Sequence, residues 1–508
     1  MLRTAAPSLI VMPAKCDAAV NGLVLASVRL PGGSALRDVQ VVDGVISRIS
    51  PAGEPRVPGS RVLELGGRYV IPGLWDEHVH MTQWALAANR IDLSGAASAR
   101  EAADVVGSYL AGRAANGGGL TLVGVGFRDA VWGDVPGLEL LDGVTGGLPT
   151  ALISHDLHCV WLNGAAATRY DVAVDASGLL REAPAFALTR ELGKLPDAVV
   201  DAWVRESAQA AAARGVVGIV DFEMTWNSDV WLRRIAGGFD SFRTDAGVYP
   251  QDLDRAIAAG MRTGLVLDGG GLLTVGPLKV LIDGSLNTRT AYCVDPYPHG
   301  GRGRLTISED HLLELLIRAR ESGFVPAVHA IGDGANEVAL NAFAAAGIDG
   351  RIEHAQFVRN RDFARFGQLG LTASVQPVHA LDDRDAADAN WAGRTDRAFP
   401  LRSLLDAGAT LVLGSDAPVA PLDPWVAMSA ASTRARQDGR GPWHPEQALT
   451  RQEALTASTR GRGSVRVGDP ADLAVLDGDP STVSDAVFAS MPVAATLVAG
   501  RFTHGGAA

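Results

Sequence analysis

The sequence predicts an α/β fold, a (β/α)8 TIM barrel with an insertion after its first strand and a small β-sandwich built from both termini. Short apolar runs alternate with helical stretches through the middle of the 508 residues, as in parallel α/β folds. Eight such runs can be marked, which is the number of strands in this barrel. Short β-type runs separated by Gly- and Pro-rich turns precede and follow them.

Composition narrows the class of protein. A hydrophobic content of 47% and only 20% charged residues indicate a globular chain with a sizeable core. The net charge of −12 argues against a nucleic-acid partner. Three scattered cysteines indicate a reducing, cytoplasmic setting. No apolar run reaches the roughly 18 residues of a membrane span. The apolar segment 9–14 is short and contains Pro13, so neither export nor a membrane partner is expected.

The two ends of the chain are expected to form one sandwich. Residues 1–72 supply the N-terminal half and residues 463–508 the C-terminal half, because neither could close a core alone. The expected β-type runs are 23–30, 39–46, 62–65, 463–468, 471–476 and 493–501.

Residues 73–462 are expected to form the barrel. Helical runs such as 308–320, with apolar residues at helical spacing, fill the gaps between strands. Residues from about 115 to 200 do not belong to any of the eight expected strand–helix units. We interpret them as an insertion above the barrel mouth. A doubly wound open sheet is the alternative fold, but the glycines at 117–119 precede a strand instead of following one. The expected strands end at His80 and span 216–222, 242–248, 278–282, 325–329, 351–354, 372–376 and 410–414.

Candidate metal ligands collect at the ends of these strands. Alternation places His78 and His80 on one face of a strand, as a divalent cation such as Zn²⁺ requires, although two exposed histidines at a strand end are an equal alternative. Lys279 lies inside an apolar strand, where an unpaired ammonium is costly unless it is modified or reaches outward to solvent.

Three further polar residues close later strands. His329 and His354 end consecutive strands, and Asp416 follows the last one. Each alone could be structural, Asp416 as a helix N-cap for example. The carboxyl ends of barrel strands converge on one face, however, so the six residues together predict a shared site.

The chain resembles the metal-dependent amidohydrolase superfamily, specifically the amidohydrolase-3 group of N-substituted formamide deformylase-like proteins. The resemblance runs from about residue 20 to 505. It is carried by Pro72-Gly73-Leu74-Trp75-Asp76-Glu77-His78-Val79-His80, Asp283-Gly284-Ser285, Arg289-Thr290-Ala291, His329-Ala330-Ile331-Gly332-Asp333, Arg351-Ile352-Glu353-His354-Ala355-Gln356, Gln376-Pro377-Val378-His379, Gly414-Ser415-Asp416-Ala417-Pro418 and Val467-Gly468-Asp469-Pro470-Ala471-Asp472-Leu473.

The resemblance implies a role for each ligand. His78 and His80 would hold a first metal, His329 and His354 a second, and a CO₂-derived carbamate on Lys279 would bridge them. Asp416 would be both a ligand and the proton shuttle. The expected cofactor is two Zn²⁺ per chain, with zinc as the default for such ligands.

The implied activity is hydrolysis of a non-peptide C–N bond, in an amide or an N-formyl or N-acyl amine, by a metal-bridging hydroxide. A deaminase or a lactone or ester hydrolase on the same scaffold is the alternative, and a non-catalytic homologue is disfavoured because all six ligands are present. The expected partner is a small amide-type substrate, and a homodimer is possible.

Several residues are candidate substrate contacts. Arg289, Gln376 and His379 follow strand motifs, with caps and loop salt bridges as the alternative. In the insertion, His158, Trp161 and Asn163 are candidates, although Leu157 stands where the family usually has glycine, and an ordinary core histidine is an equal alternative for His158. Trp84, Phe127 and Trp132 could line an apolar pocket.

Overall fold

The computed structural model describes two compact units. The barrel unit consists of Met1–Met81 and Ala208–Ala508, and the inserted unit consists of Thr82–Ser207. Within them the structure describes residues 22–112, 121–127, 129, 132–154, 159–181, 183–298, 300–436 and 438–506. The apolar segment 9–14, the glycines at 117–119 and His158 lie outside the described residues.

An eight-stranded parallel sheet forms the centre of the barrel unit, in the order β18-β17-β16-β15-β14-β13-β12-β6. Its first and last strands meet through a parallel bridge between Val79 and Ala417. The predicted fold class is therefore confirmed, and each predicted barrel strand is present. The strands are β6 (Leu74–Val79), β12 (Val216–Asp221), β13 (Arg243–Val248), β14 (Leu273–Leu281), β15 (Pro326–Ala330), β16 (Arg351–His354), β17 (Thr372–Val375) and β18 (Thr410–Leu413).

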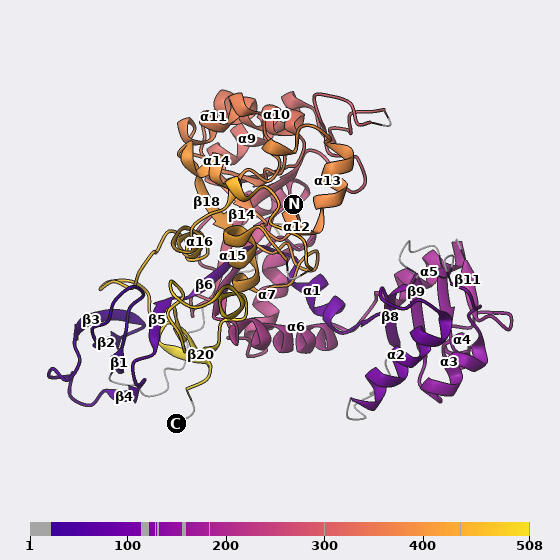
Figure 1. Ribbon diagram of the computed structural model, residues 1–508, viewed down its shortest axis with the longest axis horizontal. Coiled ribbons are helices and arrows are strands. Elements are labelled where there is room, and N and C mark those ends of the chain that lie inside the picture. Colours follow the sequence, from indigo (N-terminus) through magenta and orange to yellow (C-terminus); the bar gives the residue numbers. More distant parts are fainter. Residues whose placement is uncertain are drawn as a thin grey trace, which may run out of the picture. The chain divides into compact units, whose positions relative to one another are not determined.

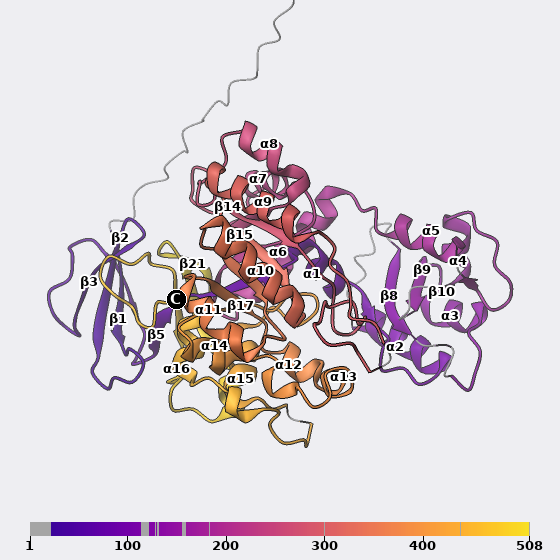
Figure 2. The same ribbon diagram turned by 90° about the horizontal axis from the view of Figure 1, so that it is seen from above.

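Helices surround these strands, and Figures 1 and 2 show α9, α10 and α14 gathered around them. Helix α9 illustrates why: Ser308 accepts a hydrogen bond from the His311 amide at its start, and Gly323 adopts φ 74° at its end. The α-helices are α7 (Asn227–Ala236), α8 (Leu253–Ala258), α9 (Glu309–Ser322), α10 (Asp333–Ala346), α11 (Phe363–Gln368), α12 (His379–Asp382), α13 (Arg384–Asn390), α14 (Leu401–Asp406), α15 (Pro424–Thr433), α16 (Arg451–Ala457) and α17 (Asp485–Ala489). The 3₁₀ turns are η2 (Pro250–Asp252), η3 (Asn360–Asp362), η4 (Thr395–Arg397) and η5 (Pro445–Gln447).

Two four-stranded sheets join the ends of the chain (Figure 1). One has the order β3-β2-β1-β4, and the other, β21-β20-β19-β5, combines three late strands with an early one. Their apolar side chains, from Leu23 to Leu497, share one core cluster. The predicted run 463–468 forms no strand. The strands are β1 (Leu23–Val28), β2 (Arg37–Val42), β3 (Val45–Pro51), β4 (Arg61–Glu64), β5 (Tyr69–Pro72), β19 (Leu473–Leu476), β20 (Val493–Val498) and β21 (Arg501–His504).

The inserted unit is built on a five-stranded sheet of order β11-β10-β9-β8-β7. It begins at Thr82, earlier than the predicted position near 115, because helix α2 packs Ala99, Ala103 and Val106 into the same apolar cluster as Ile91 of β7. Its strands are β7 (Ile91–Asp92), β8 (Leu122–Phe127), β9 (Thr150–Ser154), β10 (Cys159–Leu162) and β11 (Leu179–Arg181). Its helices are α2 (Ala99–Ala111), α3 (Leu138–Thr145), α4 (Gly164–Arg169) and α5 (Ala183–Leu192), and α1 (Met81–Ala88) and α6 (Asp197–Ala212) cross its boundaries.

Among the described residues, no helix combines the length and the apolarity that a membrane crossing requires.

Candidate metal centre

Strand ends of the barrel gather the six predicted ligands. His78 lies near the end of β6 and His80 directly follows it, while His329 and His354 lie in β15 and β16. Lys279 lies in β14, where it pairs in register with Ala327 of β15. Asp416 follows β18 and donates its backbone N–H to the His78 carbonyl at 2.7 Å. The first and last strands are therefore joined at the site itself.

Ligand atoms come close together at this face. Within the described part of the chain, one atom each of His78, His354 and Asp416 lies within 4.8 Å of the other two. Asp416 Oδ1 is 3.6 Å from His78 Nε2 and 3.5 Å from His80 Nε2. Lys279 Nζ is 3.3 Å from His78 Nε2, and the His329 ring centre is 4.5 Å from that of His354. The structure thus brings all six predicted residues to one place.

Hydrogen bonds fix the imidazole rings. His78 Nδ1 donates to Glu353 Oε2 at 2.7 Å, and His354 Nδ1 donates to Gln376 Oε1 at 2.8 Å. Each of these bonds leaves Nε2 as the ring nitrogen with a lone pair. Metal-binding histidines in proteins are held in this way, by an oxygen on the opposite ring nitrogen.

His80 and His329 are the other two predicted histidine ligands. His329 Nε2 lies 3.4 Å from the Gly284 carbonyl oxygen. His80 Nδ1 is buried and has no hydrogen-bond partner among the described residues. The ring nitrogen of His80 that faces the carboxylate is Nε2, 3.5 Å from Asp416 Oδ1. The donor set, imidazole nitrogens with a carboxylate, suits a divalent metal such as Zn²⁺.

Burial holds His78, His329 and His354 neutral, the form that binds metals. It lowers the pKa of His78 to about 4, with help from the Lys279 charge, and that of His329 to about 3. The pKa of His354 also falls well below its usual value because of burial and the neighbouring His329. At His80 burial also lowers the pKa, but the hydrogen bond with Asp416 outweighs it and raises the pKa overall. Burial alone would raise the pKa of Asp416, but the adjacent His78 ring and the hydrogen bond with His80 hold that pKa well below the usual range. The site therefore offers neutral imidazoles and an ionised carboxylate.

Lys279 is 2% exposed, so the alternative of a side chain that reaches solvent does not hold. Its Nζ lies 4.5 Å from the centre of the Phe222 ring. In the described residues no carboxylate lies within 4.0 Å of Nζ, and burial lowers the pKa of the amine to about 8. A buried amine without an anionic partner is costly as an ammonium ion.

Backbone strain marks two of the predicted ligands. His354 has φ 75° and Asp416 has φ 58°, in the left-handed region that side chains other than glycine seldom adopt. Strained residues cluster at functional sites, where the surrounding structure holds them in place.

The predicted substrate contacts lie in different settings. Gln376 is 3% exposed and orients His354. His379 is buried, with its ring stacked 6.3 Å from that of His354. Gln356 Nε2 donates to His379 Nδ1 at 3.2 Å, and His379 Nε2 has no partner. Arg289 is exposed in the loop after β14.

Of the candidates in the inserted unit, Trp161 and Phe127 are core residues, whereas Trp84 and Trp132 are half-buried. The Trp161 ring is fully buried in one apolar cluster with Phe127, 6.5 Å from the Trp132 ring, so a structural role accounts for its position. His158 lies outside the described residues.

Sequence reasoning missed the residues that hold the ligands. Glu353 is fully buried and binds His78, and Phe222 contacts both the His78 ring and Lys279. A signal was present: Arg351 and Glu353 flank Ile352 in a short and largely buried strand, where charges are costly unless paired.

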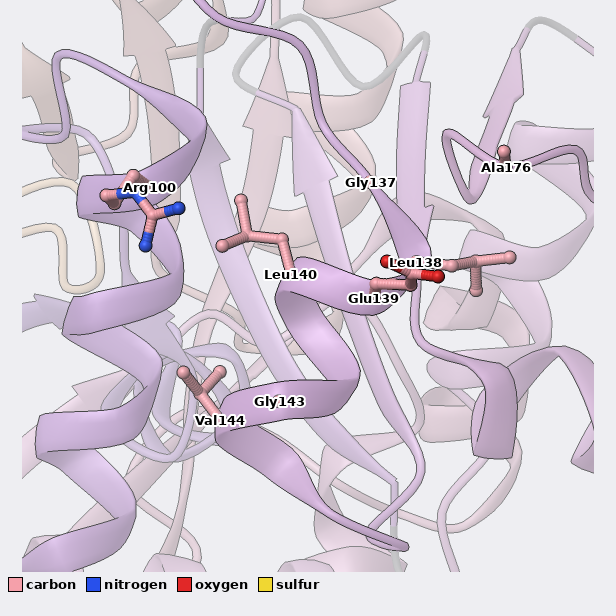
Figure 3. Close-up of a pocket in the computed structure, with 8 residues that line it drawn as sticks. All are labelled: Arg100, Gly137, Leu138, Glu139, Leu140, Gly143, Val144 and Ala176. Carbon is pink, nitrogen blue, oxygen red and sulfur yellow. The ribbon is translucent and has the colours of Figure 1, made fainter.

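An open hollow of about 870 Å³ lies in the inserted unit, beside α3 (Figure 3). Leucine and valine side chains of α3 and the Arg100 guanidinium of α2 line it. Among the described residues its lining contains no histidine or cysteine, so these residues offer no metal ligands comparable to those of the barrel.

Comparison with known proteins decides the family. The amidohydrolase-3 model, described as amidohydrolase family, matches residues 61–504. The chain belongs to the amidohydrolase family. This confirms the predicted family, and membership supports a hydrolase that uses a divalent metal. The amidohydrolase is 29% identical over 493 residues to Protein LONG AFTER FAR-RED 3 of Arabidopsis thaliana, covering 87% of this chain and 83% of the relative.

Further relatives cover almost the whole amidohydrolase. Putative amidohydrolase YtcJ of Bacillus subtilis is 26% identical, with 94% of this chain and 97% of that protein covered. N-substituted formamide deformylase of Arthrobacter pascens is also 26% identical, with 92% and 94% covered. Among solved structures, an uncharacterized metal-dependent hydrolase from Pyrococcus furiosus has a TM-score of 0.74 at 24% identity, covering 91% of this chain and 100% of that chain. This likeness shows a shared fold.

Proposed function

We propose that this amidohydrolase cleaves a C–N bond outside peptides, in an amide or an N-formyl or N-acyl amine, at a centre of two zinc ions. The observation that carries the proposal is the convergence of His78, His354 and Asp416 within 4.8 Å, with both imidazoles already oriented. The similarity to N-substituted formamide deformylase supports the substrate class.

The six strand-end residues would hold the metal. His78 and His80 would bind one ion, and His329 and His354 the other, with Lys279 between them and Asp416 beside the first pair. Bound divalent cations would supply an acidified water as the nucleophile and polarise the substrate carbonyl.

Lys279 would serve this site as a carbamate. Its neutral amine attacks the carbon of CO₂, one C–N bond forms while one C=O π bond opens to leave its electron pair on oxygen, and one N–H bond breaks as its proton leaves for solvent. The product places an anion where the buried ammonium would otherwise repel cations. The absence of a carboxylate within 4.0 Å of Nζ among the described residues supports this modification.

Asp416 would move the proton. Its Oδ1 lies 3.5 Å from His80 Nε2 and 3.6 Å from His78 Nε2, and these two neighbours hold the pKa of its carboxyl well below the usual range against the effect of burial. Oδ1 can therefore accept a proton from the attacking water and return it to the leaving amine.

His379 would bind the substrate oxygen. Because Gln356 donates to Nδ1, the neutral ring carries its proton on Nε2, which is buried and unpartnered. A donor that is already oriented can bind a carbonyl oxygen more strongly as negative charge develops on it. The exposed Arg289 would meet a more distant, anionic part of the substrate.

The proposed setting is the cytoplasm. Cys293 is a free and buried cysteine, and the chain has only three cysteines in all.

The test combines metal analysis with a substrate panel. Protein purified without chelator is expected to contain two zinc ions per chain and to hydrolyse N-formyl or N-acyl amines faster than lactones, esters or ring amines. A ¹³C-bicarbonate exchange is expected to give a carbamate signal that Lys279→Met abolishes. A preference for lactones or ring amines would contradict the substrate class. Absence of any bound metal after zinc and bicarbonate are supplied would contradict the proposed function as a whole.

A further inference from the structure

We propose that Arg351 is a positioning residue for His78 and the centre of a buried chain of ion pairs that links the site to a surface arginine, Arg460. The chain runs from Arg460 through Glu77, Arg351 and Glu353 to His78. The inference rests on the proposed function only in that His78 is taken as a metal ligand; the contacts themselves do not depend on it.

Glu353 is the carboxylate of this ion-pair network that lies next to His78, and both of its oxygens accept hydrogen bonds. Oε2 accepts the His78 Nδ1 proton at 2.7 Å, and Oε1 accepts from Arg351 Nε at 2.9 Å. Glu353 is fully buried, so no water competes for either oxygen. The orientation of the His78 ring is therefore set by where Arg351 holds the carboxylate.

Arg351 also forms hydrogen bonds with the strand that carries His78. Its Nη1 donates to Glu77 Oε2 at 2.7 Å, and its Nη2 donates to the Glu77 carbonyl at 2.8 Å and to Ser374 Oγ at 2.9 Å. Glu77 directly precedes His78. One guanidinium therefore helps to fix both the orientation of the His78 ring, through Glu353, and the position of the His78 backbone, through Glu77. A lysine cannot reproduce this planar fork of donors.

Arg460 closes the chain on the opposite side of Glu77. Its Nε donates to Glu77 Oε1 at 2.6 Å, and its Nη2 donates to Asp245 Oδ2 at 2.7 Å. The guanidinium lies 3.3 Å from the centre of the Trp75 ring, and the side chain is 34% exposed. The network therefore begins at a surface residue that follows α16 and ends at the site.

A purely structural network would stabilise the barrel without affecting the metal. The two roles differ in what they predict for metal affinity. Removal of a group that forms a hydrogen bond with a metal ligand, on the side away from the metal, typically weakens metal affinity by about 10–100-fold.

The experiment measures zinc affinity of the full chain by competition with a chromophoric chelator, and the absorption spectrum of the Co²⁺-loaded protein. Arg351→Met and Glu353→Gln are expected to weaken zinc about 10–100-fold and to alter the Co²⁺ bands. Arg351→Lys should bind zinc almost as weakly as Arg351→Met. Arg460→Met should also weaken zinc binding, but by a smaller factor.

Arg243→Met is the matched control. Arg243 makes a similar two-bond ion pair with Asp472, at 2.8 and 3.1 Å, in the same unit but without contact to the ligands. It should lower the unfolding temperature and leave zinc affinity unchanged. Wild-type zinc affinity in folded Arg351→Met would overturn the proposal. If Arg351→Met does not fold, the nearly isosteric Glu353→Gln decides in the same way.

A metal-free readout separates this inference from the proposed function. In protein labelled with ¹⁵N-histidine, His78 should carry its proton on Nδ1, and Arg351→Met should change that signal. If the wild type binds no metal but the signal changes as expected, the positioning role stands and the proposed function fails. An unchanged His78 signal in the variant would overturn the positioning role whatever metal is bound.

Discussion

Gly414, two residues before Asp416, gives the sharpest test of how tightly the site is packed. A Cβ atom at this position would lie 2.7 Å from the His78 backbone nitrogen and 2.9 Å from the His78 Cβ, whereas ordinary contact begins at 3.4 Å. In Gly414→Ala the strand that carries His78 must therefore shift by about 0.7 Å.

That shift cannot be absorbed locally. Asp76 Oδ1 accepts the amides of both His78 and Ser415, at 3.2 and 2.9 Å, and thereby connects the two strands at this point. The added methyl would lie 3.2 Å from the same oxygen. We expect a loss of stability of about 1–3 kcal/mol from overpacking. A misplacement approaching 1 Å at a catalytic centre costs on the order of 100-fold, so the activity should fall by about 10–100-fold.

The assay compares Gly414→Ala with Gly441→Ala, where an added methyl has no atom within 4 Å. Both proteins are measured for zinc affinity, thermal unfolding and turnover of the substrate that the panel identifies. The control should behave as the wild type in all three. Wild-type zinc affinity and turnover in Gly414→Ala would refute the reasoning that the last strand positions His78.

Three further predictions follow from the geometry. Asp416→Asn should reduce kcat by about 10²–10⁴-fold because an amide cannot accept the proton, and a loss below tenfold in steady-state assays would contradict the shuttle role. A hydrogen bond from Arg402 holds the pKa of Glu453 at about 2 against burial, so the stability that this pair contributes is present above pH 4.5 and is lost as the pH falls toward 2. Urea unfolding should therefore show Glu453→Gln less stable than wild type by up to about 1 kcal/mol at pH 6, with the difference shrinking at pH 3; a constant difference would argue against the pair. Trp391→Leu should cost about 2–4 kcal/mol in thermal unfolding because it removes a ring stacked 4.4 Å from Phe357, and a loss under 1 kcal/mol would show that the stack is not important for stability.

The barrel could be predicted from the sequence because parallel strands are buried on both faces and appear as short apolar runs. Strand β12, Val216–Asp221, is buried at every position and is bounded almost as predicted. The candidate ligands could be predicted for the same reason. A polar residue at the end of such a run, such as His329 or Asp416, must face the crowded carboxyl end of the barrel.

Partners across the barrel could not be predicted in this way. Spacing along β16 shows that Arg351 and Glu353 share a face, but it does not show that they meet Glu77 and His78, about 275 residues earlier. The extent of the inserted unit was underestimated for a related reason. Helix α2 is amphipathic and could have packed on the barrel; its assignment depends on which apolar surface it covers.

The pairing of β5 with β19 has a consequence for how the protein is made. Tyr69–Pro72 pairs antiparallel with Leu473–Leu476, and β6 begins at Leu74. Residues 72 and 473 are separated by about 400 positions, which a ribosome translates in about 20–80 s. During that interval the strand before His78 has no partner on this edge, and an unpaired edge invites pairing with other chains. Strand β5 thus finds its antiparallel partner only after residue 476 has left the ribosome, so a chain interrupted before that point leaves β5 unpaired on this edge although all six candidate ligands have been translated.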